Sequence, residues 1–216
     1  MSAIFLFILS LVINSTNSFK GELENYLNKN LSEYQNYKYE ILQLPKSYKK
    51  IELLKPNEFN LSGNMIYVPV QVMDKSGREF RSILSIKLKL YKNVLVAVKE
   101  ICRKTDLNKN DFILKNEDIT SVKGKPIYST QNINFLRSSV NIKQGDILVK
   151  QMTEKIPVVK IGDELNAKYI NGNVIVSLTV FSRQEGVTGE IITVITQDKK
   201  LFKAKVIDSK DVIIIE

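Results

Sequence analysis

Histidine is absent from this chain of 216 residues, and cysteine occurs once, at Cys102. The absence of histidine excludes Ser-His and Cys-His nucleophilic mechanisms and every metal site with imidazole ligands. A single cysteine excludes an intramolecular disulfide, C-x-x-C redox chemistry and zinc sites made of several thiolates. In an oxidising compartment such a thiol is either buried and inert or open to intermolecular pairing. Because Cys102 follows the apolar stretch Val94 to Ile101, we predict that it is buried.

Features that bind phosphate or sugar are also missing. The glycines form neither a G-x-G-x-x-G motif nor a phosphate loop, and there is no tryptophan to stack on a sugar ring. A glycosidase needs two carboxylates across a cleft, but most acidic residues here lie beside Gly, Asn or Lys, where aspartate typically caps a turn. We therefore predict no enzymatic activity, no cofactor and no metal. The carboxylates interpreted as turn caps include Asp106, Asp111, Asp118, Asp146 and Asp163.

The formal net charge is +9, carried mostly by lysine. The excess lies before residue 157 and forms no dense basic block, while residues 157–216 are electrically balanced. A nucleic-acid surface typically clusters basic residues with interleaved aromatics, so we expect no nucleic-acid partner. The lysines indicate a soluble surface, with attraction to an acidic partner or an anionic cell-wall polymer as the functional alternative.

An apolar run, Ile4 to Ile13, stands near the start of the chain. A membrane-spanning helix needs about 20 apolar residues, whereas this run has the length of a signal-peptide core. No Lys or Arg precedes it, but Thr16 and Ser18 are small enough for the −3 and −1 positions of a cleavage site. We predict a signal peptide over residues 1–18, cleavage after Ser18 and a mature protein without a membrane segment. A buried strand or helix of a cytosolic domain is the alternative.

Residues 19–93 predict an α+β domain. Phe19 to Tyr34 has apolar residues three, four and seven apart, which predicts an amphipathic helix facing a core. Met65–Met73 and Glu79–Tyr91 predict a long hairpin. Pro69 cannot donate a ladder hydrogen bond, so we expect its strand to be an edge or to carry a bulge there. Shorter strands are predicted at residues 37–44 and 49–54.

The sequence pattern changes near Asn93 and Val94, which predicts a hinge between the N-terminal α+β domain and the part that follows, with residues 94–98 as a short separate strand. Two similar segments, 107–114 and 142–149, each place an aspartate after a polar turn and before a hydrophobic trio. A tight turn feeding a short strand or helical turn explains both. The region between them is predicted to be rich in loops. After residue 157, regular short strands with polar turns predict a small antiparallel barrel or sandwich, with Val176 and Ile213 buried.

Four short motifs in this part resemble those of one protein family. The first, Arg137 to Leu148 followed by Met152, looks like the core of an SAF domain, which has a β-clip fold. The others resemble the strand entry that follows it, a late G-x-x-G segment and the closing strands, and they lie at residues 158–165, 186–194, and 202–206 with 212–215. The order and spacing over residues 94–216 are similar to the flagellar basal-body P-ring formation proteins, the FlgA family. Two departures are Phe181-Ser182-Arg183 in place of the usual Ala-Leu, and Ala204 where glycine is common. The motif residues are Arg137, Ile142, Gly145, Leu148, Gly162, Gly186 and Gly189.

The resemblance implies structural roles for these residues and no catalytic ones. It implies a mainly β protein, with a β-clip SAF-like domain at 94–156 and a C-terminal β domain at 157–216. It also implies a periplasmic chaperone that assists assembly of the flagellar P ring around the rod in the peptidoglycan layer. The implied partner is the P-ring subunit, with a weak contact to peptidoglycan. The alternative is a secreted SAF-domain component of a pilus-assembly system.

Overall fold

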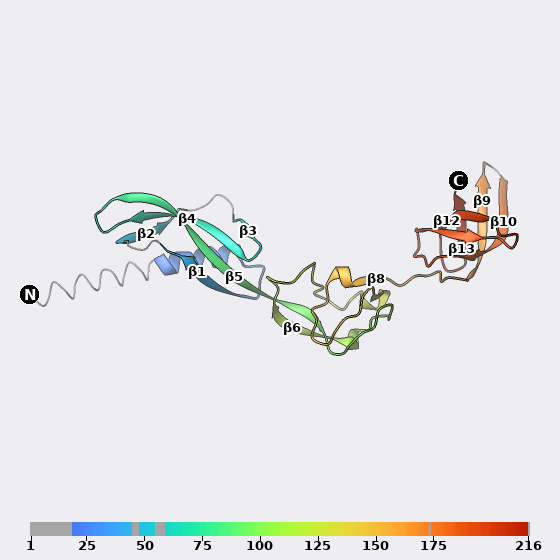
Figure 1. The fold of residues 1–216 in the computed structure, drawn as a ribbon, viewed down its shortest axis with the longest axis horizontal. Coiled ribbons are helices and arrows are strands. Elements are labelled where there is room, and N and C mark those ends of the chain that lie inside the picture. The colour runs from blue at the N-terminus through green and yellow to red at the C-terminus, as the bar shows by residue number, and fades with distance from the viewer. Residues whose placement is uncertain (1–18, 45–47, 55–58, 173, 216) are drawn as a thin grey trace, which may run out of the picture. The chain divides into compact units, whose positions relative to one another are not determined.

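The computed structural model describes residues 19–44, 48–54, 59–172 and 174–215, and these residues are mainly β (Figure 1). The predicted signal peptide and the cleavage position Ser18 lie outside them. The chain divides into two compact units. The first holds the described residues up to Val96 with Ile113–Ser129 and Ile147–Val149, and the second holds the remainder. The predicted domain limits at residues 93 and 156 stay a prediction.

The first unit is a sheet with an α-helix over residues 19–30. Four strands follow the order β1-β5-β4-β2, β3 pairs with β4, and β6 pairs with β5. The strands are β1 (Asn36–Gln43), β2 (Lys50–Leu53), β3 (Leu61–Ser62), β4 (Met65–Met73), β5 (Glu79–Ala97) and β6 (Phe112–Asp118).

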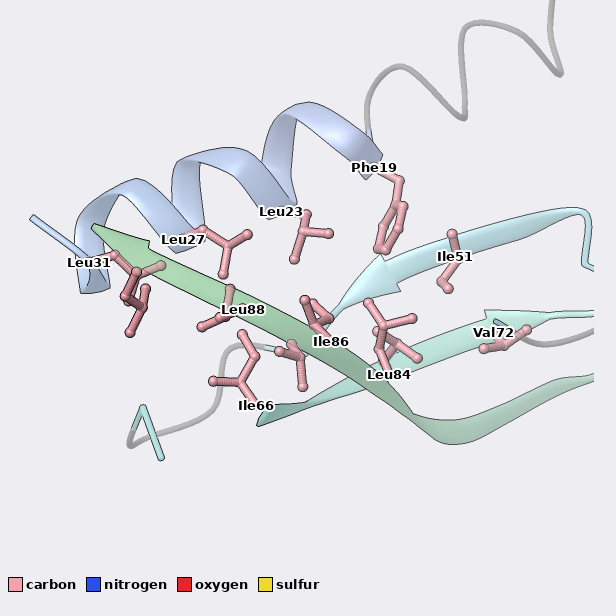
Figure 2. Close-up of a cluster of buried hydrophobic side chains, with 13 residues drawn as sticks. Phe19, Leu23, Leu27, Leu31, Ile51, Ile66, Val72, Leu84, Ile86 and Leu88 are labelled. Atoms are coloured by element: carbon pink, nitrogen blue, oxygen red, sulfur yellow. The ribbon is translucent and has the colours of Figure 1, made fainter. Parts of the chain in front are cut away.

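The helix packs on one face of this sheet, as its periodicity predicts. Its stripe has a residue every fourth position, so the side chains line up along one side of the helix. Alternation along β4 and β5 buries one face of those strands in the same cluster (Figure 2). The helical contribution is Phe19, Leu23, Leu27 and Leu31, and the labelled sheet residues are Ile51, Ile66, Val72, Leu84, Ile86 and Leu88.

The predicted hairpin of β4 and β5 is confirmed, but the expectation for Pro69 is wrong. Pro69 pairs with Ile83 without a register shift, and β4 lies between β5 and β2. The strand tolerates proline because β2 pairs only as far as Leu53 opposite Val70. Among the described residues no ladder pair of β2 stands opposite Pro69, whose carbonyl still accepts from the Leu54 N–H at 3.0 Å.

The expected break between two strands near Asn93 is also wrong, because β5 runs without interruption to Ala97. The polar residue that interrupts the apolar alternation, Lys92, is accommodated inside the strand. Its ammonium group lies 2.9 Å from Glu33 and 4.6 Å from the centre of the Tyr34 ring. Beyond it, the Leu95 N–H donates to the Ile127 carbonyl at 3.2 Å, and the Leu95 carbonyl accepts from the Leu148 N–H at 2.8 Å.

Short elements fill the second half of the chain up to residue 156. They are the 3₁₀ turns η1 (Lys109–Asp111), η2 (Ile133–Phe135) and η3 (Lys150–Met152) and the paired strands β7 (Leu136–Ser138) and β8 (Thr153–Lys155). Residues 119–132 carry no named helix or strand, which confirms the loop-rich interpretation.

Carboxylates cap the turns in this region, as predicted. In the two similar segments, Asp111 accepts from the Asn108 N–H at 3.0 Å and Asp146 from the Lys143 N–H at 2.9 Å. Two later turns repeat the arrangement, with Asp163 accepting from the residue 160 N–H and Glu190 from the Val187 N–H. Asp118 likewise accepts from the Thr120 N–H. The backbone of Asp106 forms an isolated bridge with Arg137, and a turn cap by its carboxylate stays a prediction.

The prediction that Cys102 is buried is wrong, because its side chain is exposed. Strand β5 ends at Ala97, and the next buried residue, Ile101, forms an isolated bridge with Ile142. Successive residues of an extended chain face opposite sides, so burial of Ile101 leaves its neighbour outside. The backbone carbonyl of Cys102 accepts from the Ser138 hydroxyl at 2.6 Å, which fixes this orientation.

The C-terminal β region is a closed barrel in the order β10-β11-β12-β13-β9, so the barrel alternative is confirmed. Parallel pairing of the last strand with the first closes it. Its core includes Val180, Val194 and Val212, all fully buried. The expectation of buried Val176 and Ile213 is wrong, since Val176 is 49% exposed and Ile213 is only partly covered. The strands are β9 (Glu164–Asn171), β10 (Val174–Ser182), β11 (Ile191–Ile195), β12 (Leu201–Val206) and β13 (Asp211–Ile215).

Candidate functional site

The structure places the first motif residues at a backbone bridge, at an exposed turn and in a buried segment. Ile142 is fully buried and exchanges two backbone hydrogen bonds of 2.9 Å with Ile101. Gly145 has a φ of 87°, which a side chain would strain, and its N–H donates to Ala97 at 2.8 Å. Leu148 is fully buried in the same segment. Ile142 and Leu148 are therefore surrounded as packing residues are, whereas Gly145 is exposed and serves the turn through its positive φ.

The later motif glycines lie in the barrel turns. Gly162 and Gly189 both have φ near 90° and donate to the carbonyls of residues 182 and 206. Gly186 has another constraint, because a Cβ there would stand 2.7 Å from a methyl carbon of Ile192 and 2.9 Å from one of Val206. Close approach of the backbone to the barrel core therefore requires glycine at this position.

A methyl group at Gly186 is expected to destabilise the barrel. Gly186→Ala overpacks two stiff β-branched side chains, and we expect a loss of about 1–3 kcal/mol in the free energy of unfolding. Val206→Ala vacates one of the two clashing positions, so the double variant should lose less than the sum of the two single losses. Chemical denaturation of the three variants measures this coupling. Strict additivity would contradict the close approach.

Arg137 is the centre of a charge cluster that we call the Arg137 cluster, made of Lys104, Arg137, Glu154 and Glu185. The guanidinium Nε donates to Glu154 at 2.8 Å, and its two terminal nitrogens form a bidentate pair with Glu185. The Lys104 ammonium lies 2.7 Å from Glu154 and 3.4 Å from Glu185. Two cations and two carboxylates thus satisfy one another, with the arginine side chain only 11% exposed.

The electrostatic consequences follow the contacts. The hydrogen bonds from Arg137 hold the pKa of Glu185 at about 2. Those from Lys104 and then Arg137 lower the pKa of Glu154, and the bond to Glu185 raises that of Arg137. A cavity of about 360 Å³ lies beside these groups. The cluster connects β7 and β8 to the barrel residue Glu185, and its charges are already paired, so we interpret it as a structural lock.

The contribution of the Arg137 cluster to the stability of the fold is expected to decrease in acid. A carboxylate whose pKa is lowered in the folded state stabilises the fold above its unfolded value, and that contribution is lost as the pH falls through the folded value. For Glu185 the window runs from about pH 4.5 down to about pH 2. The difference in Tm between the wild type and Glu185→Gln should be full above this window and shrink within it. Thermal denaturation as a function of pH measures it, with exposed Glu164→Gln as the control. A pH-independent difference would contradict the pairing.

The motif pattern points to Arg137 but not to its partners. Glu154 and Glu185 lie 17 and 48 positions away along the chain, so no local pattern connects them. Beside the cluster, a second and more apolar cavity of about 580 Å³ is lined by residues 132, 134–136, 155–158 and 187–188. Phe135 lines it and is 71% exposed.

Among the residues that the structure describes, no cluster of three or more His, Cys, Asp or Glu side chains could hold a metal ion. Among the same residues, no helix is long and apolar enough to cross a membrane.

Comparisons with known proteins give a consistent result. The family model described as a chaperone for flagella basal body P-ring formation matches residues 92–214. The flagella basal body P-ring formation protein FlgA of Aquifex aeolicus (strain VF5) is 26% identical over 214 residues, covering 94% of this chain and 84% of its own.

Two crystal structures share the fold. Salmonella FlgA in its open form gives a TM-score of 0.61 at 12% identity, covering 89% of this chain and 91% of the other. Flagellar protein FlgA from Thermotoga maritima MSB8 gives 0.57 at 19% identity, covering 92% and 72%. The family match spans more than half of the sequence and takes in all seven motif residues. The chain therefore belongs to the FlgA family of chaperones for flagellar basal-body P-ring formation.

Proposed function

We propose that this protein is a periplasmic chaperone that binds the flagellar P-ring subunit and assists its assembly around the rod, in the peptidoglycan layer. The observation that carries the proposal is the family match over residues 92–214. The P-ring formation relative from Aquifex aeolicus, aligned over almost the whole chain, supports it. Membership of a chaperone family implies a non-enzymatic role. The function then depends on the binding surface and not on a set of catalytic groups.

The mechanism we propose is shielding. A ring subunit that polymerises through its own surfaces must expose those surfaces before assembly, and exposed strand edges and apolar patches aggregate. A strand or groove contact with this protein covers such a surface until the neighbouring subunit replaces it. The lysine-rich surface adds a weak, salt-sensitive attraction to anionic peptidoglycan, which keeps the chaperone near the assembly site.

Secretion is part of the proposal and has its own test. The apolar run near the start of the chain supports a signal peptide that is removed after Ser18. Protein recovered from the periplasm should then begin at or near Phe19 on N-terminal sequencing. Intact Met1 on soluble cytoplasmic protein would overturn the periplasmic location.

A deletion strain tests the assembly role. It should be poorly motile in soft agar, and electron microscopy of its basal bodies should show rods without P rings. Excess P-ring subunit should restore motility in part, because mass action raises the yield of a step that a chaperone only assists. A deletion strain with normal rings and normal swimming would overturn the proposal.

The pilus-assembly alternative is not favoured, because the family model and the relatives described above are flagellar. The gene neighbourhood gives an inexpensive test. We expect genes for the flagellar rod and rings beside this one.

A further inference from the structure

One edge of the barrel is left unpaired by the strands of the barrel itself. Strand β10 pairs with β9 from Val174 to Phe181, but its pairing with β11 is confined to Phe181 and Ser182. Within the described residues, the other edge of β10 from residue 174 to residue 179 therefore has no partner strand. This stretch carries a row of backbone amides and carbonyls that an added strand can use.

The side chains along this hairpin are apolar on both faces. Val174 and Val176 continue the face that is buried at Val180, but they remain 61% and 49% exposed. On the opposite face Ile175 stands across from Ile170, and these two are 65% and 50% exposed. Exposed apolar side chains on both faces are typical of a strand inside a sheet, where neighbouring strands cover them.

The usual protections of an exposed edge are missing. Natural edge strands carry lysine or another charge, proline, or a bulge that prevents pairing with another chain. Here no charged residue and no proline occurs between Lys168 and Arg183, although 25% of the chain is charged. The register with β9 is also continuous, without a bulge. The edge therefore offers no obstacle to an incoming strand.

We infer that the free edge of β10, at residues 174–178, binds an extended, uncharged and apolar strand of the P-ring subunit by strand addition. The inference rests on the proposed function and names the surface through which it acts. The incoming strand gains ladder hydrogen bonds from the β10 backbone, and its side chains cover Ile175 on one face and Val176 on the other.

The apolar area of the patch indicates a transient complex from which the partner can dissociate. Four half-exposed aliphatic side chains present on the order of 400 Å² of apolar surface, whereas a stable complex buries about 800 Å² on each partner. The same patch alone would also bury too little surface to hold two copies of this chain in a permanent dimer. A transient strand contact matches a subunit that leaves for the ring, where its own neighbour takes over the edge.

A charge on the edge should abolish this contact. Ile175→Lys introduces the protection that the strand lacks, and Ile191→Lys is the matched control, because Ile191 is a 55% exposed barrel isoleucine at the start of β11. With purified P-ring subunit, calorimetry should give a Kd at least about tenfold weaker for Ile175→Lys and unchanged for Ile191→Lys. Both variants should keep the wild-type Tm.

Hydrogen exchange of the wild-type complex adds a readout at the backbone. Amides of residues 174–178 should exchange more slowly when the subunit is bound. If wild-type protein binds the subunit but Ile175→Lys binds equally well, or protection falls elsewhere, the hairpin inference is overturned and the proposed function stands. If the wild type does not bind the subunit at all, the proposed function fails first. A dimer that Ile175→Lys dissociates would show a second copy as the occupant and overturn the inference.

Discussion

Replacement of Val212 with aspartate is expected to unfold the C-terminal barrel. Val212 is fully buried and lies on β13, where it pairs with Val206 on one side and with Ala167 on the other. It therefore occupies the strand that closes the barrel. A carboxylate here meets only apolar neighbours and either loses its hydration or takes up a proton, at a cost of several kcal/mol.

This cost is large compared with the total stability of a domain, which is about 5–15 kcal/mol. Chemical denaturation monitored by circular dichroism should show no cooperative unfolding of the barrel in Val212→Asp. The amide signals of this variant should be poorly dispersed in NMR spectra. Val176→Asp is the matched control on another strand of the same barrel. Because that residue is half exposed, its carboxylate stays hydrated and should cost less than about 1 kcal/mol. Equal losses at the two positions would contradict the core described above.

Local patterns predicted much of this fold. The stripe from Phe19 to Leu31 identified the helix, and alternation around the Asp74 turn identified the hairpin of β4 and β5, because both patterns report burial of one face. In that turn, Asp74 accepts from the N–H groups of Ser76 and Arg78. The turn at Asn171-Gly172 likewise marked the hairpin of β9 and β10, where Gly172 has a φ of 57°.

The errors arose where distant parts of the chain decide the outcome. Val174, Val176 and Val180 follow one alternating pattern, yet only Val180 is buried. The pattern does not reveal this difference, because it arises from the pairing of β10 with β11, which is confined to Phe181 and Ser182. The break expected near Asn93 is absent because β5 continues to Ala97, and the partners of Lys92 within this strand, Glu33 and Tyr34, come from the segment after the helix. A short stretch of sequence reveals neither the extent of the β10–β11 pairing nor the distant partners of Lys92.

The candidate sites divide in the same way. The glycines of the G-x-x-G segment could be found by their spacing, since a positive φ or a close approach has a strong residue preference. The Arg137 cluster could be found only in part, because its partner Glu185 lies across the fold. The free edge of β10 had a usable signal, the lack of charge from Tyr169 to Ser182, but its meaning depends on a strand that is missing beside it.

Truncation of Leu27 to alanine is expected to give a large loss in the first unit. Leu27 is fully buried at the middle of the helical stripe, between Leu23 and Leu31, against the sheet residues of Figure 2. Removal of its branched end forfeits the transfer free energy of three carbons and leaves a cavity that a rigid sheet cannot fill. Comparable substitutions cost about 2–5 kcal/mol. Alanine is the best helix former, so the loss reports packing and not helix propensity.

Leu42→Ala is the control for this change, because Leu42 lies on β1 of the same unit and is 52% exposed. We expect it to cost no more than about 0.5 kcal/mol. Tyrosine fluorescence during urea denaturation suits the measurement, since the chain has nine tyrosines and no tryptophan. Without the helix, the buried face of β4 and β5 would be open to solvent, so Leu27→Ala should also aggregate on heating at a lower temperature than the control. If Leu27→Ala is no less stable than Leu42→Ala, the helix does not hold that face.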